Sequence, residues 1–230
     1  MSYGVIGNTS AFGADVRGSS PCGITKIKRM NLLTQNTKLK KTSKALNLRV
    51  FNFGIPAYKS ASGKLTCPMA DTCVKFCYAK KGAYIWSNVQ PAFEKRYQLS
   101  KTDEFIGAVN AEIIKKKVDY VRVHDSGDYY SPKYLAKWIQ IAKDNPNVRF
   151  YSYTNMVDML LKADLPDNYD IIFSDSGKQK NLINERRHRH TKIFSSHSDL
   201  MDADYVDATN VDLMATRWFN ENKKVGLVFH

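Results

Sequence analysis

The chain has 230 residues and a mass of 26.2 kDa, which suits one large domain or a domain with an extension. Apolar residues make up 43% and charged residues 25%, a globular mix that excludes wholesale disorder, collagen-like repetition and a disulfide miniprotein. The 35 Lys and Arg residues exceed the 22 Asp and Glu residues, giving a net charge of +13.

Two absences concern membranes and export. No apolar run approaches the roughly 20 residues that span a bilayer. Residues 1–20 lack the basic-then-apolar pattern of a signal peptide. We therefore expect a cytoplasmic protein that does not associate with a membrane.

The positive charge is concentrated near the N-terminus. Residues 16–70 contain eleven Lys or Arg residues and no Asp or Glu, whereas the remaining positions are nearly balanced. Such a segment is typical of a solvated basic arm, and it can also attract a polyanion such as nucleic acid or a nucleotide. Because residues 1–47 show weak hydrophobic periodicity, we interpret them as a basic N-terminal extension of a domain at 48–230.

Order is predicted to begin with a strand at residues 48–56, which are rich in β-branched and aromatic side chains. A loop that contains several cysteines follows it. Apolar residues then recur at helical spacing over 90–100 and 102–117. Thr102 is suited to cap the second of these helices, and three lysines in its last turn complement the helix dipole.

Strands and helices alternate from residue 118 onward. Ser131 and Pro132 are typical of the start of a helix. The alternation indicates βαβ units, a mainly parallel sheet and an α/β fold class. Polar turns follow three of the strands, and we expect them to meet at one edge, because ligands of such sheets bind at the carboxyl ends of strands. Strands are predicted at 119–128, 148–155, 169–177, 191–197, 202–209 and 223–230, and helices at 131–146, 156–166 and 180–190.

Three of the four cysteines, Cys67, Cys73 and Cys77, lie within eleven residues. In a reducing compartment this crowding indicates metal or redox chemistry. Zinc sites usually contain CxxC pairs, which are absent here, whereas the wider spacing suits three corners of an iron–sulfur cluster. We predict a [4Fe-4S] cluster whose fourth iron is open or is held by Cys22, another side chain or a substrate. A zinc site and three buried free thiols are the alternatives.

A second motif follows the strand that begins near residue 119. Gly127, between Asp125 and Asp128, predicts a tight turn with exposed backbone N–H groups. Two carboxylates at a strand end can bind an ammonium group, a ribose hydroxyl or a metal, or serve in acid–base chemistry. The alternative is a plain turn in which Asp and Ser side chains cap their own backbone.

The basic run at 186–190, Arg-Arg-His-Arg-His, can bind phosphate, although a solvated basic face is the favoured interpretation. On a helix, His188 and His190 would point about 200° apart, so they would not share a metal.

Two long runs carry a resemblance to known families. CPMADTCVKFCYAKKGAY, and VRVHDSGDYYSPKYLAKWIQIAKDNPNVRFYSYTN about 40 residues later, resemble the gene product eighty-eight family of phages and prophages over residues 44–155. The same motifs look like the radical S-adenosylmethionine (SAM) superfamily. In that superfamily a partial (β/α)6 barrel holds a [4Fe-4S] cluster on three cysteines, and SAM completes the fourth iron.

The second resemblance implies a partial (β/α) barrel for residues 48–230, radical SAM-like and with a mainly parallel sheet. It implies cluster ligation by the three loop cysteines, although the Cx5Cx3C spacing here is wider than the Cx3Cx2C of that superfamily. It also implies SAM as a cofactor. The residues expected to face SAM are Asp125, Ser126, Gly127, Asp128, Ser152 and Thr154.

Three functions follow from these features. The first is a radical SAM-like enzyme in an infected host cell, which needs an electron donor and takes a nucleotide or nucleic-acid substrate steered by the basic segment. The second is a non-catalytic iron–sulfur protein with Cys22 as the fourth ligand. The third is a nucleic-acid-binding protein whose iron–sulfur or zinc centre only stabilises the fold.

Overall fold

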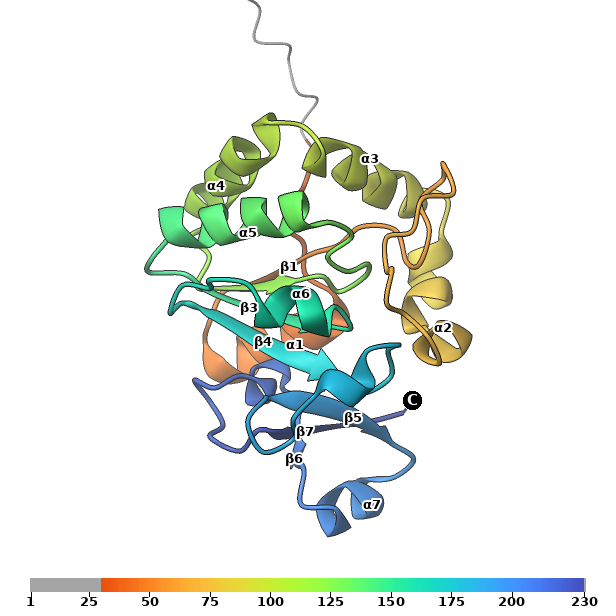
Figure 1. Ribbon diagram of the computed structural model, residues 1–230. Coiled ribbons are helices and arrows are strands. Elements are labelled where there is room, and N and C mark those ends of the chain that lie inside the picture. The colour runs from red at the N-terminus through yellow and green to blue at the C-terminus, as the bar shows by residue number, and fades with distance from the viewer. Residues whose placement is uncertain (1–29, 230) are drawn as a thin grey trace, which may run out of the picture. The chain divides into compact units, whose positions relative to one another are not determined.

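A seven-stranded sheet organises residues 30–229, the part of the chain that the computed structural model describes (Figure 1). Every pair of neighbouring strands is parallel, and the sheet curls into a half-barrel. The spatial order is β1-β2-β3-β4-β5-β7-β6, so only the last two strands depart from chain order. The strands are β1 Val50–Phe53, β2 Tyr120–Val123, β3 Arg149–Thr154, β4 Tyr169–Ser174, β5 His190–Phe194, β6 Val206–Asp207 and β7 Lys224–Val228.

The strands are connected mainly by helical segments. The α-helices are α1 Thr37–Leu46, α2 Cys73–Phe76, α3 Gln90–Ser100, α4 Glu104–Lys116, α5 Pro132–Asp144, α6 Val157–Leu161 and α7 His197–Asp202. Four short 3-10 turns are η1 Tyr78–Lys80, η2 Gly82–Ile85, η3 Lys180–Leu182 and η4 Asp212–Ala215. The predicted α/β class and parallel sheet are therefore confirmed.

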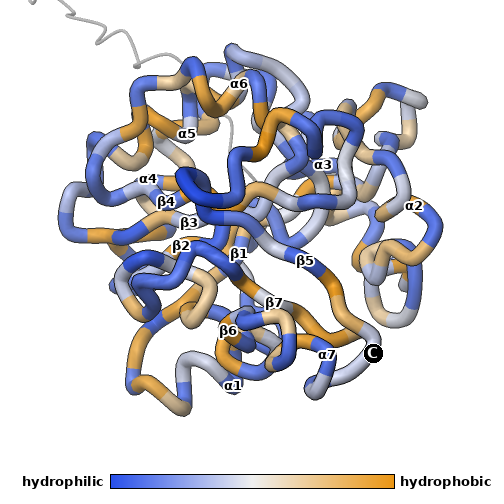
Figure 2. The backbone as a smooth tube through the Cα atoms, turned by 60° about the horizontal axis from the view of Figure 1, so that its bottom comes forward, coloured by the Kyte–Doolittle hydropathy of each residue, from blue (hydrophilic) through white to orange (hydrophobic). Residues whose placement is uncertain are grey.

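The outer face of the sheet is covered by α3, α4 and α5 (Figure 1). Phe53 of β1, Phe105 of α4 and Trp138 of α5 are fully buried and pack edge to face, with centroid separations of 5.1 to 5.5 Å. Hydrophobic and hydrophilic residues alternate along α5 at helical spacing (Figure 2). This amphipathic pattern buries one stripe of the helix against the strands.

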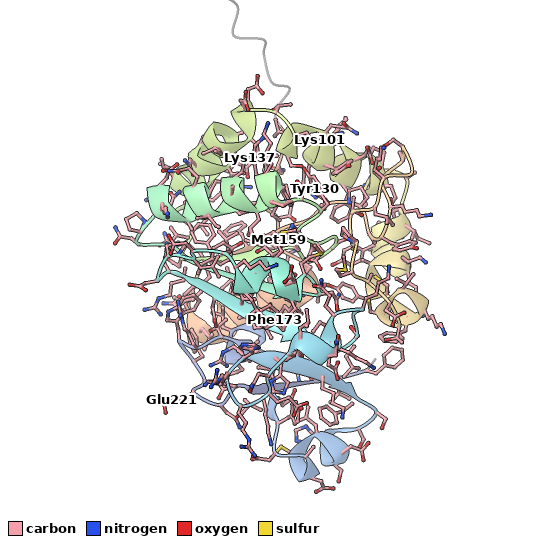
Figure 3. The ribbon with its side chains drawn as sticks, viewed as in Figure 1. Lys101, Tyr130, Lys137, Met159, Phe173 and Glu221 are labelled. Atoms are coloured by element: carbon pink, nitrogen blue, oxygen red, sulfur yellow. The ribbon has the colours of Figure 1, made fainter. Side chains whose placement is uncertain are left out.

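One charged side chain on the buried side of α5 has a structural role. Lys137, labelled in Figure 3, is only 8% exposed. Its Nζ donates hydrogen bonds to the backbone oxygens of Ser100, at 3.2 Å, and Thr102. Because the last carbonyl groups of a helix lack partners within it, Lys137 caps α3 and ties it to α5.

The inner face is filled by α1 and η4. Leu39 of α1 and Leu213 of η4 belong to one buried cluster with Tyr120, Tyr151 and Val225 of the strands. The side chain of Asn36 accepts a hydrogen bond from the backbone N–H of Leu39 and so caps α1.

One compact unit includes Asn31 and the residues after it, so residues 31–47 of the predicted extension belong with the domain predicted at 48–230. Leu32 and Leu33 are buried, and Thr34 pairs with Asn52 of β1 through two backbone hydrogen bonds. Lysines make up much of α1, but the helix also carries a short apolar stripe, which packs on the inner face of the sheet. Residues 1–29 of the predicted extension, including Cys22, lie outside the described residues.

Local signals predicted some helix ends and not others. Helix 90–100 is confirmed as α3, and Ser131 caps α5 by accepting from the backbone N–H of Tyr134 at 3.2 Å. The predicted cap at Thr102 is wrong, since α4 begins at Glu104. The Thr102 hydroxyl instead donates to the carbonyl of Leu99 at the end of α3.

The predicted helix at 180–190 is also wrong. Within this range only residues 180–182 are helical, as the 3-10 turn η3, and β5 already begins at His190. The Asn184 side chain accepts hydrogen bonds from the backbone N–H groups of Arg186 and Arg187, both at 3.1 Å. An asparagine that bonds the backbone two and three residues ahead stabilises a turn in competition with a helix.

Within residues 30–229, no helix combines the length and the apolar composition that a bilayer crossing demands.

Candidate functional site

The three-cysteine loop lies across the carboxyl ends of the central strands. The backbone N–H of Asp128, after β2, donates to Thr66 O at 2.9 Å. The backbone N–H of Lys178, after β4, donates to Met69 O at 2.8 Å, and Ala70 pairs with Gly177. Figure 1 shows α2 on the side toward which the arrowhead of β4 points. The predicted polar turns and the loop therefore share one edge of the sheet.

The three thiols are free and half-buried. Cys67 Sγ accepts from the backbone N–H of Tyr58 at 3.4 Å, and Cys73 Sγ lies 3.9 Å from Asn155 Nδ2. Burial raises the pKa of Cys67, as does the neighbouring charge of Asp128, and burial also raises the pKa of Cys77. Both groups are therefore protonated at neutral pH, and a metal would have to displace their protons.

The thiols do not already form a closed metal site. Among the described side chains, no three from His, Cys, Asp and Glu surround a common point suited to a metal ion. The chemistry of the donor set still fits iron or zinc, because three soft thiolate ligands come from one loop. The predicted alternative ligand Cys22 lies outside the described residues.

Asp128 joins the loop to two strands. Its Oδ1 accepts from Thr154 Oγ1 at 2.6 Å and from the backbone N–H of Tyr129 at 2.8 Å. Its Oδ2 accepts from the backbone N–H of Asn155 at 2.9 Å. Both oxygens are thus occupied by the protein itself, and we assign Asp128 a positioning role.

The buried carboxyl of Asp128 gives a pH prediction. Burial raises its pKa to about 6, above the value of about 3.9 expected in the unfolded chain. The folded state then binds more protons between these values, so the free energy of unfolding falls by about 2 kcal/mol as pH rises from 4 to 6. We expect Asp128→Asn to remove this fall, as measured by urea unfolding of both proteins across that range.

The comparison isolates Asp128 because the other buried carboxyls are present in both proteins. If the free energy of unfolding falls equally with pH in the wild type and in the variant, the assignment of this fall to Asp128 is contradicted. The variant should also be less stable at every pH, because an amide N–H₂ group cannot accept from the backbone N–H of Asn155.

Asp125 presents an oxygen without an ordinary partner. Its Oδ2 accepts from the Tyr84 hydroxyl at 3.0 Å, whereas its buried Oδ1 makes no hydrogen bond of normal geometry within residues 30–229. Burial raises the pKa of Asp125. A Cβ atom at Gly54 would lie 2.2 Å from Oδ1, so the glycine provides the space that this carboxyl occupies.

The remaining predicted cofactor residues shape the edge of the sheet. Gly127 has φ +83°, and a Cβ atom there would lie 2.2 Å from Ile55 Cγ1. The Ser126 carbonyl accepts from the backbone N–H of Ile55 at 3.0 Å. Ser152 and Thr154 are buried, and the Ser152 hydroxyl donates to the Tyr153 carbonyl at 3.3 Å. The structure therefore brings Asp125 to the edge, but it encloses both strand hydroxyls.

Three residues that were not predicted surround Asp125. The Tyr78 hydroxyl donates to the Asp125 carbonyl, and Tyr84 donates to its carboxylate. Burial raises the pKa of both tyrosines, which keeps them protonated as donors. Arg122 of β2 reaches Tyr78 Oη at 3.4 Å, and its own Nε has no partner among the described residues. A charged residue inside a buried Val-Arg-Val strand is the sequence signal that points to Arg122.

Arg122 connects the edge to a buried charge centre under η4. Asp212 is fully buried and lies 3.2 Å from Arg122 Nη1 and 2.6 Å from Lys38 Nζ. It also accepts from the hydroxyl of Tyr151 at 2.6 Å. Two cations and a phenol therefore balance one carboxylate inside the half-barrel.

The acid-free basic segment is used in more than one way. Lys38 joins the buried centre at Asp212, and Arg49 pairs with Asp119 at 2.7 Å on the surface. Lys40, Lys41 and Lys44 of α1 are exposed.

Comparisons with known proteins identify relatives. Residues 30–227 match the family model described as Gene product 88. The "Gene 88 protein" of Mycobacterium phage L5 is 28% identical over 167 residues, which cover 66% of this chain and 68% of that protein. The "Gene 88 protein" of Mycobacterium phage D29 is 26% identical over 157 residues, which cover 57% and 63%. Both relatives are phage proteins, which supports a bacteriophage origin. No solved structure shows a significant match.

Proposed function

Because the chain belongs to the Gene product 88 family, as the resemblance of its cysteine and Gly-Asp motifs predicted, we propose that it is an iron–sulfur protein of phages with radical SAM-like activity. One observation carries the proposal. Three free thiols come from a single loop that lies across the carboxyl ends of parallel strands, where ligands of such sheets bind.

The donor set suits a [4Fe-4S] cluster. Three thiolates supply three corners, and a position not ligated by the loop remains for SAM or another ligand. Loading requires the segment from Ala70 to Lys80 to bring Cys73 and Cys77 to Cys67, and Cys67 and Cys77, whose pKa values burial raises, to release their protons. The helical elements of this segment, α2 and η1, are short. The path of the backbone can therefore change here without disrupting a long helix.

When bound, such a cluster supplies an electron and one open iron to SAM. The chain's own residues would bind and orient SAM. Asp125 Oδ1 has no hydrogen-bond partner of normal geometry among the described residues and would accept from a SAM amino group once this buried oxygen is uncovered, while Tyr84 fixes the other carboxylate oxygen. Thr154, which the resemblance implied would face SAM, donates its hydroxyl to Asp128 and would hold that carboxylate in place. The exposed lysines of α1 would attract a nucleotide or nucleic-acid substrate.

The test is anaerobic reconstitution of the full chain, followed by iron and sulfide counts. We expect about four iron and four sulfide ions per chain. Replacing Cys67, Cys73 or Cys77 by Ala should abolish the cluster. The matched control is Cys22→Ala, because it removes the one cysteine outside the loop. A chain that binds zinc without sulfide, or that binds neither metal, contradicts the cluster.

Radical SAM-like activity needs a separate measurement. We expect SAM to change the electron paramagnetic resonance signal of the reduced cluster, and to be cleaved. Asp125→Asn should keep the iron count and weaken the SAM response. If SAM neither changes the signal of the reduced cluster nor is cleaved, and if the Cys22→Ala variant loses the cluster, the results would instead favour the non-catalytic iron–sulfur protein.

A further inference from the structure

A second candidate site lies at the opposite edge of the sheet from the cysteine loop. It is a cavity of about 380 Å³ beside the first residues of β4 and the residues that precede β5 and β7. Asp170, Arg187 and Lys223 line it from these three positions, and Leu160 at the end of α6 contributes from the helix layer. Because all strands are parallel, this amino edge is separate from the carboxyl edge that carries the thiols.

The charge around the cavity is positive, because four cations line it and only two carboxylates, Asp167 and Asp170. Asp170 accepts from the backbone N–H of Arg217 at 2.7 Å and pairs with Arg189 Nε at 3.6 Å, so its charge is already balanced. Arg189 and Arg217 also donate to backbone carbonyls, which fixes both guanidinium groups in the wall. These two arginines are positioning residues.

Two other cations keep donors for a ligand. Arg187 is exposed and lines the cavity, and its side chain makes no ion pair or hydrogen bond within residues 30–229. Lys223 Nζ donates to the Arg186 carbonyl at 3.3 Å and retains two further N–H donors. Burial lowers the pKa of His188, and the charges of Arg187 and then Lys223 lower it further, so both cations lie near this ring.

Apart from Asp167, the rest of the cavity is lined mainly by apolar and aromatic side chains. Phe173, labelled in Figure 3, packs edge to face on the His188 ring with centroids 5.6 Å apart. Leu165 and Pro166 extend this surface toward the start of β4. A cationic rim beside an aromatic and aliphatic wall matches a ligand that has a phosphate group and a flat apolar part.

We propose that this amino-edge pocket binds a phosphate-bearing ligand, with Arg187 and Lys223 as the phosphate-binding residues. The wall formed by Phe173 and His188 receives the part of the ligand attached to the phosphate. The site is independent of the cysteine loop, so it does not rest on cluster binding. The basic run at 186–190 thus gains a role through a turn that directs Arg187 to the cavity.

The test is calorimetric titration of the full chain at low salt with three probes: inorganic phosphate, AMP and a short oligothymidylate. We expect saturable binding of at least one probe, weakened about tenfold or more in Arg187→Gln. The matched control is Arg186→Gln, which removes the same charge one residue away and outside the cavity lining. It should weaken binding less than about twofold.

A second variant guards against an indirect effect. Lys223→Gln should weaken the same probe, and both exposed substitutions should leave the unfolding temperature unchanged. Tightest binding of AMP would identify a nucleotide as the source of the phosphate, and tightest binding of the oligonucleotide would identify a nucleic-acid backbone. No saturable binding, or equal weakening by Arg186→Gln and Arg187→Gln, overturns the proposal.

Discussion

Replacement of Asp212 by Ala is expected to lower the free energy of unfolding by about 3–5 kcal/mol. The carboxylate is fully buried and balances Arg122 and Lys38, at 3.2 and 2.6 Å. Removing it would leave two cations inside the half-barrel without a counter-charge. The loss would also remove the acceptor for the Tyr151 hydroxyl.

Urea unfolding measures this loss, and Asp119→Ala is the matched control. Asp119 pairs with Arg49, whose side chain is 52% exposed, so its removal should cost less than about 1 kcal/mol. Burial opposes ionisation of Asp212, but Arg122 and Lys38 outweigh it and lower the pKa. A lowered folded pKa stabilises the protein above the unfolded value of about 3.9 and ceases to do so as pH falls. The difference between the wild type and Asp212→Ala should therefore shrink in acid.

A loss equal to that of Asp119→Ala would show that the buried centre relaxes or admits water. That outcome would also remove the argument that Arg122 is held in place for the carboxyl edge of the sheet.

Gly127→Ala should destabilise the protein by about 2–5 kcal/mol. The backbone at Gly127 has φ +83°, which costs an L-residue about 1–2 kcal/mol. The added Cβ atom would also lie 2.2 Å from Ile55 Cγ1 and 3.3 Å from Ile55 O, and displacing a packed group typically costs a further 1–3 kcal/mol or so. Ile55 cannot move freely, because its N–H donates to Ser126 O.

The control for this prediction is Gly107→Ala. Gly107 lies inside α4, and a Cβ atom there meets nothing within 4 Å. Alanine is a better helix former, so this change should stabilise the protein by about 0.5–1 kcal/mol. In the same unfolding assay, we expect Gly127→Ala to lower the free energy of unfolding and Gly107→Ala to raise it. A neutral Gly127→Ala would mean that the turn has a second accessible conformation.

Local chemistry explains which elements could be predicted from the sequence. Ser131 and Pro132 act within one turn of helix α5, so their signal depends on no distant residue. The alternation of strands and helices likewise predicted the parallel sheet and the edge shared by its polar turns. The radical SAM resemblance and the cluster stay predictions.

Elements defined by distant partners were missed. Helix α1 contains mainly Lys and Thr, and its burial depends on Leu39 meeting Tyr120 and Leu213, which are far away in the chain. Nothing near Asp212 in the sequence indicates that two cations and a tyrosine will meet it. The Asn184 side chain accepts hydrogen bonds from the backbone N–H groups of Arg186 and Arg187, which explains why the predicted helix at 180–190 does not form.

The strand order at the end of the sheet has a consequence for synthesis on the ribosome. Within residues 30–229, strand β6 pairs with β7 alone, yet β7 is the last of the seven described strands along the chain and lies between β5 and β6. During translation the segment around Val206 must therefore wait without a partner until residues 224–228 leave the exit tunnel. Insertion of β7 between β5 and β6 completes the described sheet, so this edge of the half-barrel reaches its native form only after residues 224–228 have been made.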